Sequence, residues 1–269
     1  MSGLAMLAFF ALASSTEADY SACPAIPGAP ALISDRSVNR IVLGEMHGTN
    51  EIPAAFANLA CLAASSGRKL VVALEHSATE QGAIDRFMKS DGGPTAVQAL
   101  TASMEWRSPY PDGRTSAARL ALLQSLRKMV RAKELERVVA IMPMWSGSSA
   151  DYEKQMAANV LNAGKGADLV LALVGNVHAQ LVPWQDSPNT SYLPMAANLP
   201  RASTRTLNVI GNGGSGWVCM PDCRPHDFGP AGTSEHRGIK LMRGGKGRPY
   251  DGFFNLGVPT TASPPATTQ

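Results

Sequence analysis

The chain has 269 residues, of which 45% are hydrophobic and 17% are charged, and its formal net charge is +3. This apolar content is enough to build a core, so disorder over the whole length is excluded. No run of about 20 apolar residues occurs after the N-terminus, which excludes a multi-span membrane protein. The net charge is too small to indicate a nucleic-acid-binding domain. At roughly 150 residues per domain, the length allows one large domain or two small ones.

Residues 1–22 have the pattern of a secretory signal. Leu4–Ala13 is a continuous apolar run, and small residues follow it as in a cleavage zone. The usual basic region is missing, because Met1–Ala22 contains no Lys or Arg, so a buried N-terminal helix is the alternative. We therefore expect an exported protein, periplasmic or secreted, with no transmembrane anchor once the signal is removed.

Four cysteines agree with export, since an even number in an exported chain suggests disulfides. We favour the pairs Cys23–Cys61 and Cys219–Cys223 among the three possible pairings. A zinc knuckle is the alternative for the second pair, although no second Cys/His pair stands at zinc spacing. A lipid-modified Cys23 is a further alternative, because Ser21-Ala22-Cys23 resembles the end of a lipobox.

Apolar runs alternate with helical periodicity through the body of the chain. The expected strands are Ile41–Leu43, Leu70–Leu74, Val138–Met142, Leu169–Val174 and Thr206–Ile210. The expected helices are Pro53–Ser66, Ala78–Lys89, Thr115–Lys133 and Asp151–Ala163. Continuous apolar strands separated by helices predict a parallel sheet covered on both faces. In the third helix the basic residues Arg119, Arg127, Lys128 and Arg131 are interpreted as a solvated face.

The character of the sequence changes from Gly213 onward, where glycine, proline and short strands dominate. Trp217–Met220, Gly238–Met242 and Phe253–Leu256 are expected to form an antiparallel extension of the sheet. The fold class is therefore α/β, with a mainly parallel central sheet flanked by helices and an antiparallel C-terminal extension. We expect one domain over residues 23–257 and a disordered Thr/Pro/Ala-rich tail over 258–269.

Two Gly-x-x-His turns stand at predicted strand ends. Gly44-Glu45-Met46-His47 follows the first strand, and Gly175-Asn176-Val177-His178 follows the fourth. The carboxyl ends of parallel strands form the edge at which open α/β sheets bind ligands. A third strand end contributes Glu75. We therefore expect Glu45, His47, Glu75 and His178 to converge in one crevice.

Imidazole and carboxylate groups together have two chemical uses. They can hold a divalent metal with a position open for water, or they can act as a general base with its orienting partner. His76 is a weaker candidate, since it can simply begin the next helix. His226 and His236 are expected on the surface or, at most, in contact with substrate. Met144 and Trp145 are expected either to line the crevice or to pack in the core.

The two histidine motifs resemble the signatures of the erythromycin esterase/ChaN-like superfamily, which includes haem-binding uptake proteins of the ChaN type and Tiki-like metalloproteases. The first motif is Leu43–Glu51 and the second is Val174–Ala179. Between them, Tyr152-Glu153-x-x-Met156-Ala157 is similar to an Arg-Asp-x-x-Met-Ala helix of ChaN-type members, with Tyr152 in place of Arg. The resemblance covers roughly residues 41–211.

The superfamily divides by chemistry. In the esterase branch the resemblance makes His47 the base that activates water. In the Tiki-like branch His47, His178, Glu45 and Glu75 hold a catalytic divalent metal (zinc, manganese, cobalt or iron). In the ChaN branch the fold binds haem, with Tyr152 and His178 as candidate ligands.

We expect an exported hydrolase of ester or amide bonds acting on a small molecule or peptide. The alternatives are a haem- or metal-binding uptake protein and a pseudoenzyme that binds a partner.

Other familiar motifs fail or are absent. Gly211–Gly216 matches Gly-x-Gly-x-x-Gly after a strand, but no helix follows to bind a pyrophosphate, so we predict a hairpin turn. The sequence contains no Gly-x-Ser-x-Gly elbow and no His-Glu-x-x-His pair. A serine hydrolase of the usual α/β type and the common zinc protease helix are therefore not expected.

Overall fold

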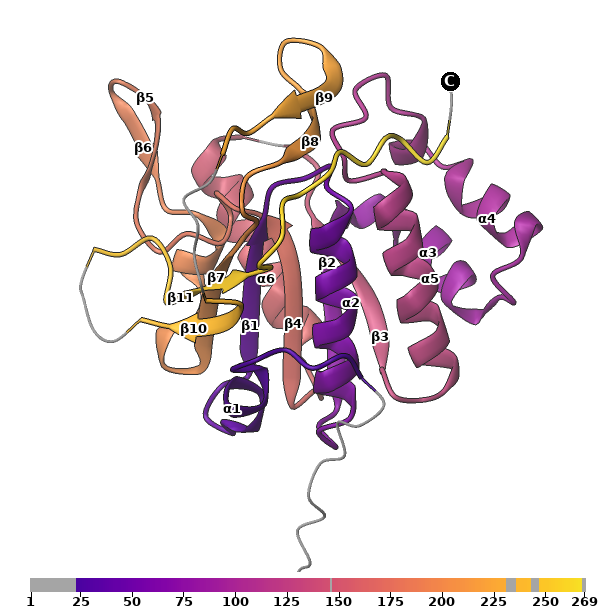
Figure 1. Cartoon of the computed structure of the whole chain (residues 1–269), viewed down its shortest axis with the longest axis horizontal. Helices are drawn as coiled ribbons and strands as arrows, with labels where there is room; N and C mark the ends of the chain where they lie inside the picture. Colours follow the sequence, from indigo (N-terminus) through magenta and orange to yellow (C-terminus); the bar gives the residue numbers. More distant parts are fainter. Residues whose placement is uncertain (1–22, 146, 231–235, 243–246, 268–269) are drawn as a thin grey trace, which may run out of the picture.

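A seven-stranded sheet with helices on both faces forms the body of the chain (Figure 1). The computed structural model describes residues 23–145, 147–230, 236–242 and 247–267. The strand order is β10-β11-β7-β1-β4-β2-β3, and every neighbouring pair is parallel except β10 with β11. The predicted α/β class, with a mainly parallel sheet, is therefore confirmed.

The elements have the following bounds. The strands of the main sheet are β1 Arg40–Glu45, β2 Leu70–Ser77, β3 Arg137–Met142, β4 Leu169–Gly175, β7 Thr204–Ile210, β10 Gly238–Leu241 and β11 Gly252–Asn255. Two separate hairpins consist of β5 Trp184–Ser187 with β6 Thr190–Tyr192, and β8 Ser215–Cys219 with β9 Cys223–Asp227. The α-helices are α1 Ala29–Ser34, α2 Glu51–Ala64, α3 Gln81–Lys89, α4 Pro94–Thr101, α5 Ala117–Arg131 and α6 Ser149–Ala163. Short 3₁₀ helices are η1 Ala78–Glu80, η2 Glu105–Arg107, η3 Met195–Asn198 and η4 Arg201–Ser203.

The continuous apolar runs of the strands are explained by burial on both faces of the sheet. Along β1, Ile41 and Leu43 pack with α2, α3 and α5 on one face, whereas Val42 packs with α6 on the other. All three side chains are fully buried. A strand that is covered on both faces loses the apolar–polar alternation of a half-exposed strand.

Hydroxyl caps set two of the helix starts. The Ser116 hydroxyl accepts the Arg119 N–H at 3.3 Å, and the Ser148 hydroxyl accepts the Asp151 N–H at 3.2 Å. Each cap satisfies one of the backbone donors that a first turn leaves unpaired. The helix predicted from Thr115 therefore begins at Ala117, and the helix predicted from Asp151 begins at Ser149.

The expectation that the basic residues of α5 form a solvated face is wrong for two of them. Arg119 is 1% exposed and Arg127 is 8% exposed. Arg119 stands three residues before Leu122 and so lies on the apolar stripe of the helix. Arg127 donates to the Ser90 carbonyl oxygen at 2.9 Å.

The C-terminal part extends the sheet only in part as predicted. β10 and β11 form the antiparallel pair, but β11 joins β7 in parallel. The segment predicted from Trp217 belongs instead to the separate hairpin of β8 and β9. The turn 211–214 therefore leads into a strand, as expected, but β7 and β8 do not pair as a hairpin.

The tail is not disordered over residues 258–267, contrary to expectation. It crosses the carboxyl edge of the sheet and makes isolated bridges to Gly214, Thr49 and Ser116 (Figure 1). Ser263 donates its N–H to the Gly48 carbonyl oxygen at 2.8 Å. These backbone hydrogen bonds outweigh the low intrinsic order of a Thr/Pro/Ala-rich composition.

Both favoured disulfides, Cys23–Cys61 and Cys219–Cys223, are present. Cys23 therefore has no thiol for lipid attachment in this structure, and the second pair has none for zinc. The expected signal segment 1–22 lies outside the described residues. In the part of the chain that the structure describes, no helix has the length and apolar character needed to cross a membrane.

Candidate active site

The two Gly-x-x-His motifs lie side by side because β1 and β4 are neighbouring parallel strands. Their register pairs Gly44 with Val174 and Glu45 with Gly175. The Asn176 N–H continues this ladder by donating to the Glu45 carbonyl oxygen at 2.9 Å. Both histidines therefore leave the same edge of the sheet, beyond the carboxyl ends of the two strands.

Each glycine of the pair gives room to the other motif. A Cβ at Gly44 would lie 2.9 Å from the Asn176 Cα, and a Cβ at Gly175 would lie 3.1 Å from the His47 Nε2. The first contact is with backbone and cannot relax easily. The spacing of the motif thus reflects close packing of one turn on the other, as expected for glycine where two backbones approach.

Each histidine is held by its own buried carboxylate. The His47 Nδ1 lies 3.0 Å from a Glu45 oxygen, and the His178 Nδ1 lies 2.7 Å from a Glu153 oxygen. Both glutamates are 2% exposed. A carboxylate at Nδ1 fixes the ring orientation and assigns the Nδ1 proton to that bond, so that Nε2 lies on the opposite side of the ring, toward Glu75.

Glu75 lies between the two rings. Its Oε1 atom is 3.6 Å from the His47 Nε2 and 3.7 Å from the His178 Nε2. The two Nε2 atoms therefore lie closer together than the sum of these distances, inside the roughly 8 Å span that a shared water or metal requires. The other oxygen of Glu75 accepts the Gly175 N–H at 2.5 Å. The structure thus brings Glu45, His47, Glu75 and His178 together.

Two arginines that the sequence did not predict as site residues complete the site. Arg119 on α5 forms an ion pair with Glu45. Arg114 directs its Nη1 to within 3.7 Å of the Glu75 Oε1, and Asp112 holds the same guanidinium at Nε and Nη2. A third positive group therefore faces the oxygen that both histidines approach.

The charges in this cluster shift one another's protonation. Burial would lower the pKa of His47, but the carboxylates of Glu75 and Glu45 outweigh it and raise this pKa to about 10. The pKa of His178 is also raised, because Glu75 and Glu153 outweigh its burial. Burial opposes ionisation of Glu75, yet the neighbouring His178, His47 and Arg114 hold its pKa well below the ordinary value. The free site therefore pairs an ionised Glu75 with a protonated His47 at neutral pH, and the same charges favour the protonated form of His178.

A metal does not fit this arrangement of residues. In the described ranges, no three His, Cys, Asp or Glu side chains are disposed to hold a metal ion. The Arg114 guanidinium stands beside the Glu75 oxygen that a cation bound by His47 and His178 would need, so a divalent ion there would face a fixed positive charge.

Haem coordination by Tyr152 is also disfavoured by the surroundings of its side chain. The Tyr152 ring packs between Trp145 and His178, with centroid distances of 5.5 and 6.2 Å. Burial and the negative charge of Glu75 raise the pKa of its phenol. A tyrosine ligand to haem iron coordinates as phenolate, so this environment opposes it.

The remaining histidine candidates lie elsewhere. His76 is 1% exposed, stacks on Trp106 and pairs with Glu105 at 3.0 Å. His226 lies on β9, where its Nε2 contacts the Asp222 carbonyl oxygen. His236 packs edge-on against Phe253. Of the two apolar candidates, Met144 is 70% and Trp145 66% exposed, so neither belongs to the core.

The helical spacing of the sequence also indicates burial of Glu153 and Arg119. Glu153, Met156, Ala157 and Val160 have the i, i+3, i+4, i+7 spacing of one helix face, and all four are buried. Arg119 shares the stripe of α5 in the same way. A charged residue in phase with an apolar stripe must find a buried partner. Arg114 and Asp112 stand in a loop, where no periodicity points to them.

A cavity of about 290 Å³, here called the reactive cavity, opens over this cluster. Its walls come from β1, β4, the 112 loop and the disulfide-closed hairpin, and they include Glu45, Met46, His47, Asp112, Asn176, His178, Val218 and Met220. The hairpin is tied to the first motif, because the Trp217 N–H donates to the Gly48 carbonyl oxygen at 2.8 Å. The site is therefore a walled crevice at the carboxyl edge, the usual ligand position in this class of fold.

Comparison with known proteins finds similar folds among solved structures only. No family model and no curated protein matches the sequence. Among solved structures, the chain is similar to the erythromycin esterase EreC in its open conformation, with 11% identity, a TM-score of 0.55, and coverage of 89% of this chain and 79% of that one. It is also similar to a protein from Bacillus cereus, with 9% identity, a TM-score of 0.52, and coverage of 88% and 92%. ChaN of Campylobacter jejuni, described with cofacial haem binding, aligns at a TM-score of 0.38 over 67% of this chain and 85% of that one, with 12% identity.

The fold and the site thus define an α/β protein with paired histidines at the carboxyl edge of its sheet. More particularly, its fold is similar to that of the erythromycin esterase EreC, in agreement with the family resemblance of the two motifs. At these identities the likeness concerns the fold alone.

Proposed function

We propose that this protein is a hydrolase of ester bonds whose reacting water is bound between His47, His178 and Glu75. One observation carries the proposal: the Nε2 atoms of both histidines face the same Glu75 oxygen, while each Nδ1 is held by a separate buried glutamate. Two oriented imidazoles with free Nε2 atoms supply the proton acceptor and the proton donor that ester hydrolysis needs.

The two rings work as one titrating unit in this proposal. They share Glu75, so their protons are released in two steps that belong to the pair. After the first proton has left, the neutral imidazole accepts a proton from water and the charged one donates to the leaving alcohol. The expected role of His47 as a lone base is thereby replaced by a shared acid–base pair.

Arg114 and Glu75 have the remaining roles. The ionised Glu75 orients the water through its Oε1 atom and keeps the second imidazole charged. Arg114 faces the same point with one Nη1 donor while Asp112 holds its other nitrogens, so it can stabilise the oxyanion of the tetrahedral intermediate. No metal is used in any step.

The likeness to a solved esterase narrows the proposed substrate class to esters. The likeness to EreC, a protein named as an erythromycin esterase, supports an ester rather than an amide. The partner is then a small-molecule ester rather than a nucleic acid. Two disulfides support export, because such bonds persist in oxidising compartments.

The proposal is tested by screening the purified protein against an ester library and a peptide library. We expect ester turnover that falls by roughly 10²- to 10⁴-fold in His47→Ala and in His178→Ala, as is typical of general acid–base groups. His226→Ala is the matched control and should keep full activity. The kcat/KM of the wild type should increase as pH rises above neutrality, because the pKa of His47 is about 10. Stoichiometric haem binding without turnover of any library member would contradict the proposal.

A further inference from the structure

Two more cavities adjoin the reactive cavity, one on each side of it. The first, of about 620 Å³, shares Asp112 with the reactive cavity, and we call it the charged cavity. The second, of about 260 Å³, shares Met46 and Asn176 with it, and we call it the uncharged cavity. The uncharged cavity lies at the ends of β7 and β1, the reactive cavity at the ends of β1 and β4, and the charged cavity at the ends of β2 and β3. Because the strand order is β7-β1-β4-β2-β3, the histidine pair lies between the other two cavities.

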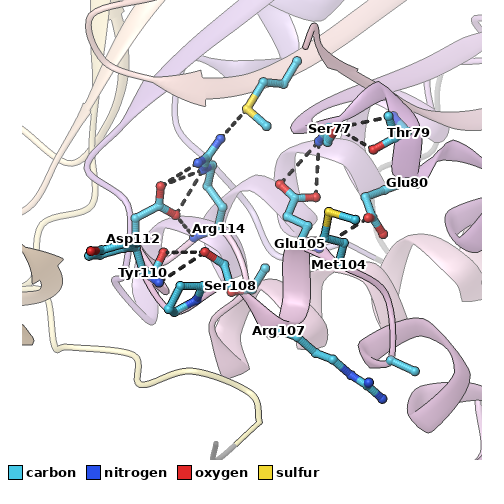
Figure 2. Close-up of a pocket in the computed structure, with 14 residues that line it drawn as sticks. Ser77, Thr79, Glu80, Met104, Glu105, Arg107, Ser108, Tyr110, Asp112 and Arg114 are labelled. Atoms are coloured by element: carbon cyan, nitrogen blue, oxygen red, sulfur yellow. Dashed lines mark hydrogen bonds and ion pairs between the residues drawn. The ribbon is translucent and has the colours of Figure 1, made fainter. Parts of the chain in front are cut away.

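The charged cavity has two polar walls (Figure 2). Ser77, Thr79, Glu80 and Glu105 form one wall, and Ser108, Tyr110, Asp112 and Arg114 form the other. The side chain of Arg107 points away from both walls in the same view. Met104, Pro109 and Met142 add apolar surface between the polar groups.

The charges of Asp112, Arg114 and Glu105 are paired within the protein. Both Asp112 oxygens accept from Arg114, and Glu105 accepts from His76 and from the Ser77 N–H. These three side chains therefore offer no unpaired charge to an anionic or cationic ligand. What the walls offer is a mixture of hydroxyl donors, carboxylate acceptors and C–H surface.

Glu80 adds one acceptor to this set. The residue is 5% exposed and lines the charged cavity, and its Oε2 atom has no hydrogen-bond partner among the described residues. A buried polar atom without a partner carries a free-energy cost that a donor from a ligand would relieve. A neutral group with several hydroxyls, such as glycerol or a sugar, matches such walls in donors, acceptors and C–H faces.

The uncharged cavity has a different chemistry. No Asp, Glu, Lys, Arg or His is among the residues that line it. Met46, Ile52, Val209, Ile210 and Phe228 supply its apolar surface, and Asn176 and Asn208 lie among them. A site of this kind takes an aliphatic group, because burial of apolar surface is its main source of binding free energy.

We propose that the substrate is an amphiphilic ester that joins an aliphatic arm to a neutral polyhydroxylated arm. The aliphatic arm lies in the uncharged cavity, the polyhydroxylated arm lies in the charged cavity, and the ester carbon lies over His47 and His178. This inference rests on the proposed function, since it places the scissile bond in the reactive cavity.

Turnover of matched esters tests the two arms. The glycerol monoester of butanoic acid is compared with propyl butanoate, and butyl glycerate with butyl propanoate, so that only the hydroxyls differ within a pair. In at least one pair the hydroxylated ester should have a kcat/KM about 10-fold or more above its partner, because a polar cavity discriminates strongly against an analogue that lacks the hydrogen-bonding groups.

Two filling variants assign the arms to the cavities. Asn208→Phe should reduce kcat/KM for a butanoyl or hexanoyl chain about 10-fold more than for an acetyl chain, and Asn208→Ala should not. Thr79→Trp should remove the preference for the hydroxylated ester and leave the chain-length profile unchanged. Neither residue belongs to the histidine cluster, and circular dichroism spectra of both variants verify folding.

Calorimetric titration with glycerol monohexyl ether, which cannot be hydrolysed, separates binding from catalysis. The ether should bind to the wild type and more weakly, by about fivefold or more, to both filling variants. Binding of this kind without ester turnover would overturn the proposed function and keep the assignment of the arms. A different result is ester turnover without a preference for hydroxyls and with an unchanged chain-length profile in Asn208→Phe. That result would overturn the assignment of the two arms but leave the proposed hydrolase function standing. If the ether does not bind and no ester is turned over, the proposed function and the assignment of the arms are both wrong.

Discussion

His47 and His178 leave neighbouring parallel strands and present their Nε2 atoms to one oxygen of Glu75, at 3.6 and 3.7 Å. The backbone register of β1 and β4 fixes this relationship, and Glu45 and Glu153 hold the two rings from behind. Because the rings share one carboxylate, neither titrates nor acts independently of the other.

The double variant His47→Ala/His178→Ala should therefore lose little more activity than the worse of the two single variants. Residues that act as a unit give strongly non-additive losses in kcat/KM, whereas independent groups give losses that multiply. The measurement is a double-mutant cycle on the ester that the wild type turns over best. Multiplicative losses would mean that the two rings do not share a step.

Glu153→Gln should lower kcat far more than it raises KM. The substitution keeps the size of the side chain but removes the charge that fixes the Nδ1 proton of His178. A loss confined to kcat indicates a role in the transition state, whereas a change in KM alone would indicate a role in binding. Glu136→Gln, on the exposed turn before β3, is the control and should behave as the wild type.

Arg119→Met should destabilise the fold by about 3–5 kcal/mol, because it leaves the buried Glu45 carboxylate without its guanidinium partner. Urea unfolding gives the free energy of unfolding directly. Lys128→Met on the exposed side of the same helix is the matched control, expected within about 0.5 kcal/mol of the wild type. Equal stabilities of the two variants would mean that the Arg119–Glu45 pair contributes nothing net.

The cluster also predicts how stability depends on pH. The pKa of His47 rises from 6.5 to about 10 on folding, so its contribution is complete below pH 6.5 and is lost as pH rises toward 10. Glu75 has a lowered pKa, so its contribution is present above about pH 4.5 and is lost as pH falls further. Urea unfolding of the wild type and of His47→Gln should therefore differ most near pH 5.5 and converge near pH 10. A difference that grew with pH would contradict the assignment of charge.

Removal of divalent metal should leave activity unchanged. Arg114 stands beside the Glu75 oxygen that a bound cation would require, so the reaction is expected to proceed with water and the histidine pair alone. The check is turnover after dialysis against a chelator, together with elemental analysis. Loss of activity that returns on adding zinc or manganese would establish a metal mechanism instead.

A haemin titration of the same sample should give no one-to-one Soret band.

Much of the fold follows from the sequence because its signals are local. Five continuous apolar runs, separated by amphipathic helices long enough for crossovers, require a parallel sheet covered on both faces. The two Gly-x-x-His turns are equally local: β4 ends at Gly175 and β1 ends one residue after Gly44, and the carboxyl ends of parallel strands share one edge. That His47, His178 and Glu75 would meet there is a consequence of those two facts.

The tertiary structure decided what the charged residues do. Arg119 and Glu153 are in phase with the apolar stripes of their helices, but only the packed chain shows that Glu45 and His178 are their partners, and Arg114 reaches Glu75 from a loop with no periodicity. The tail 258–267 has a composition typical of disorder, yet backbone hydrogen bonds order it, and these depend on which distant segments lie beside it. Ion pairs and backbone bridges between distant segments are properties of the packed chain, because their free energy depends on burial and distance rather than on neighbours in sequence.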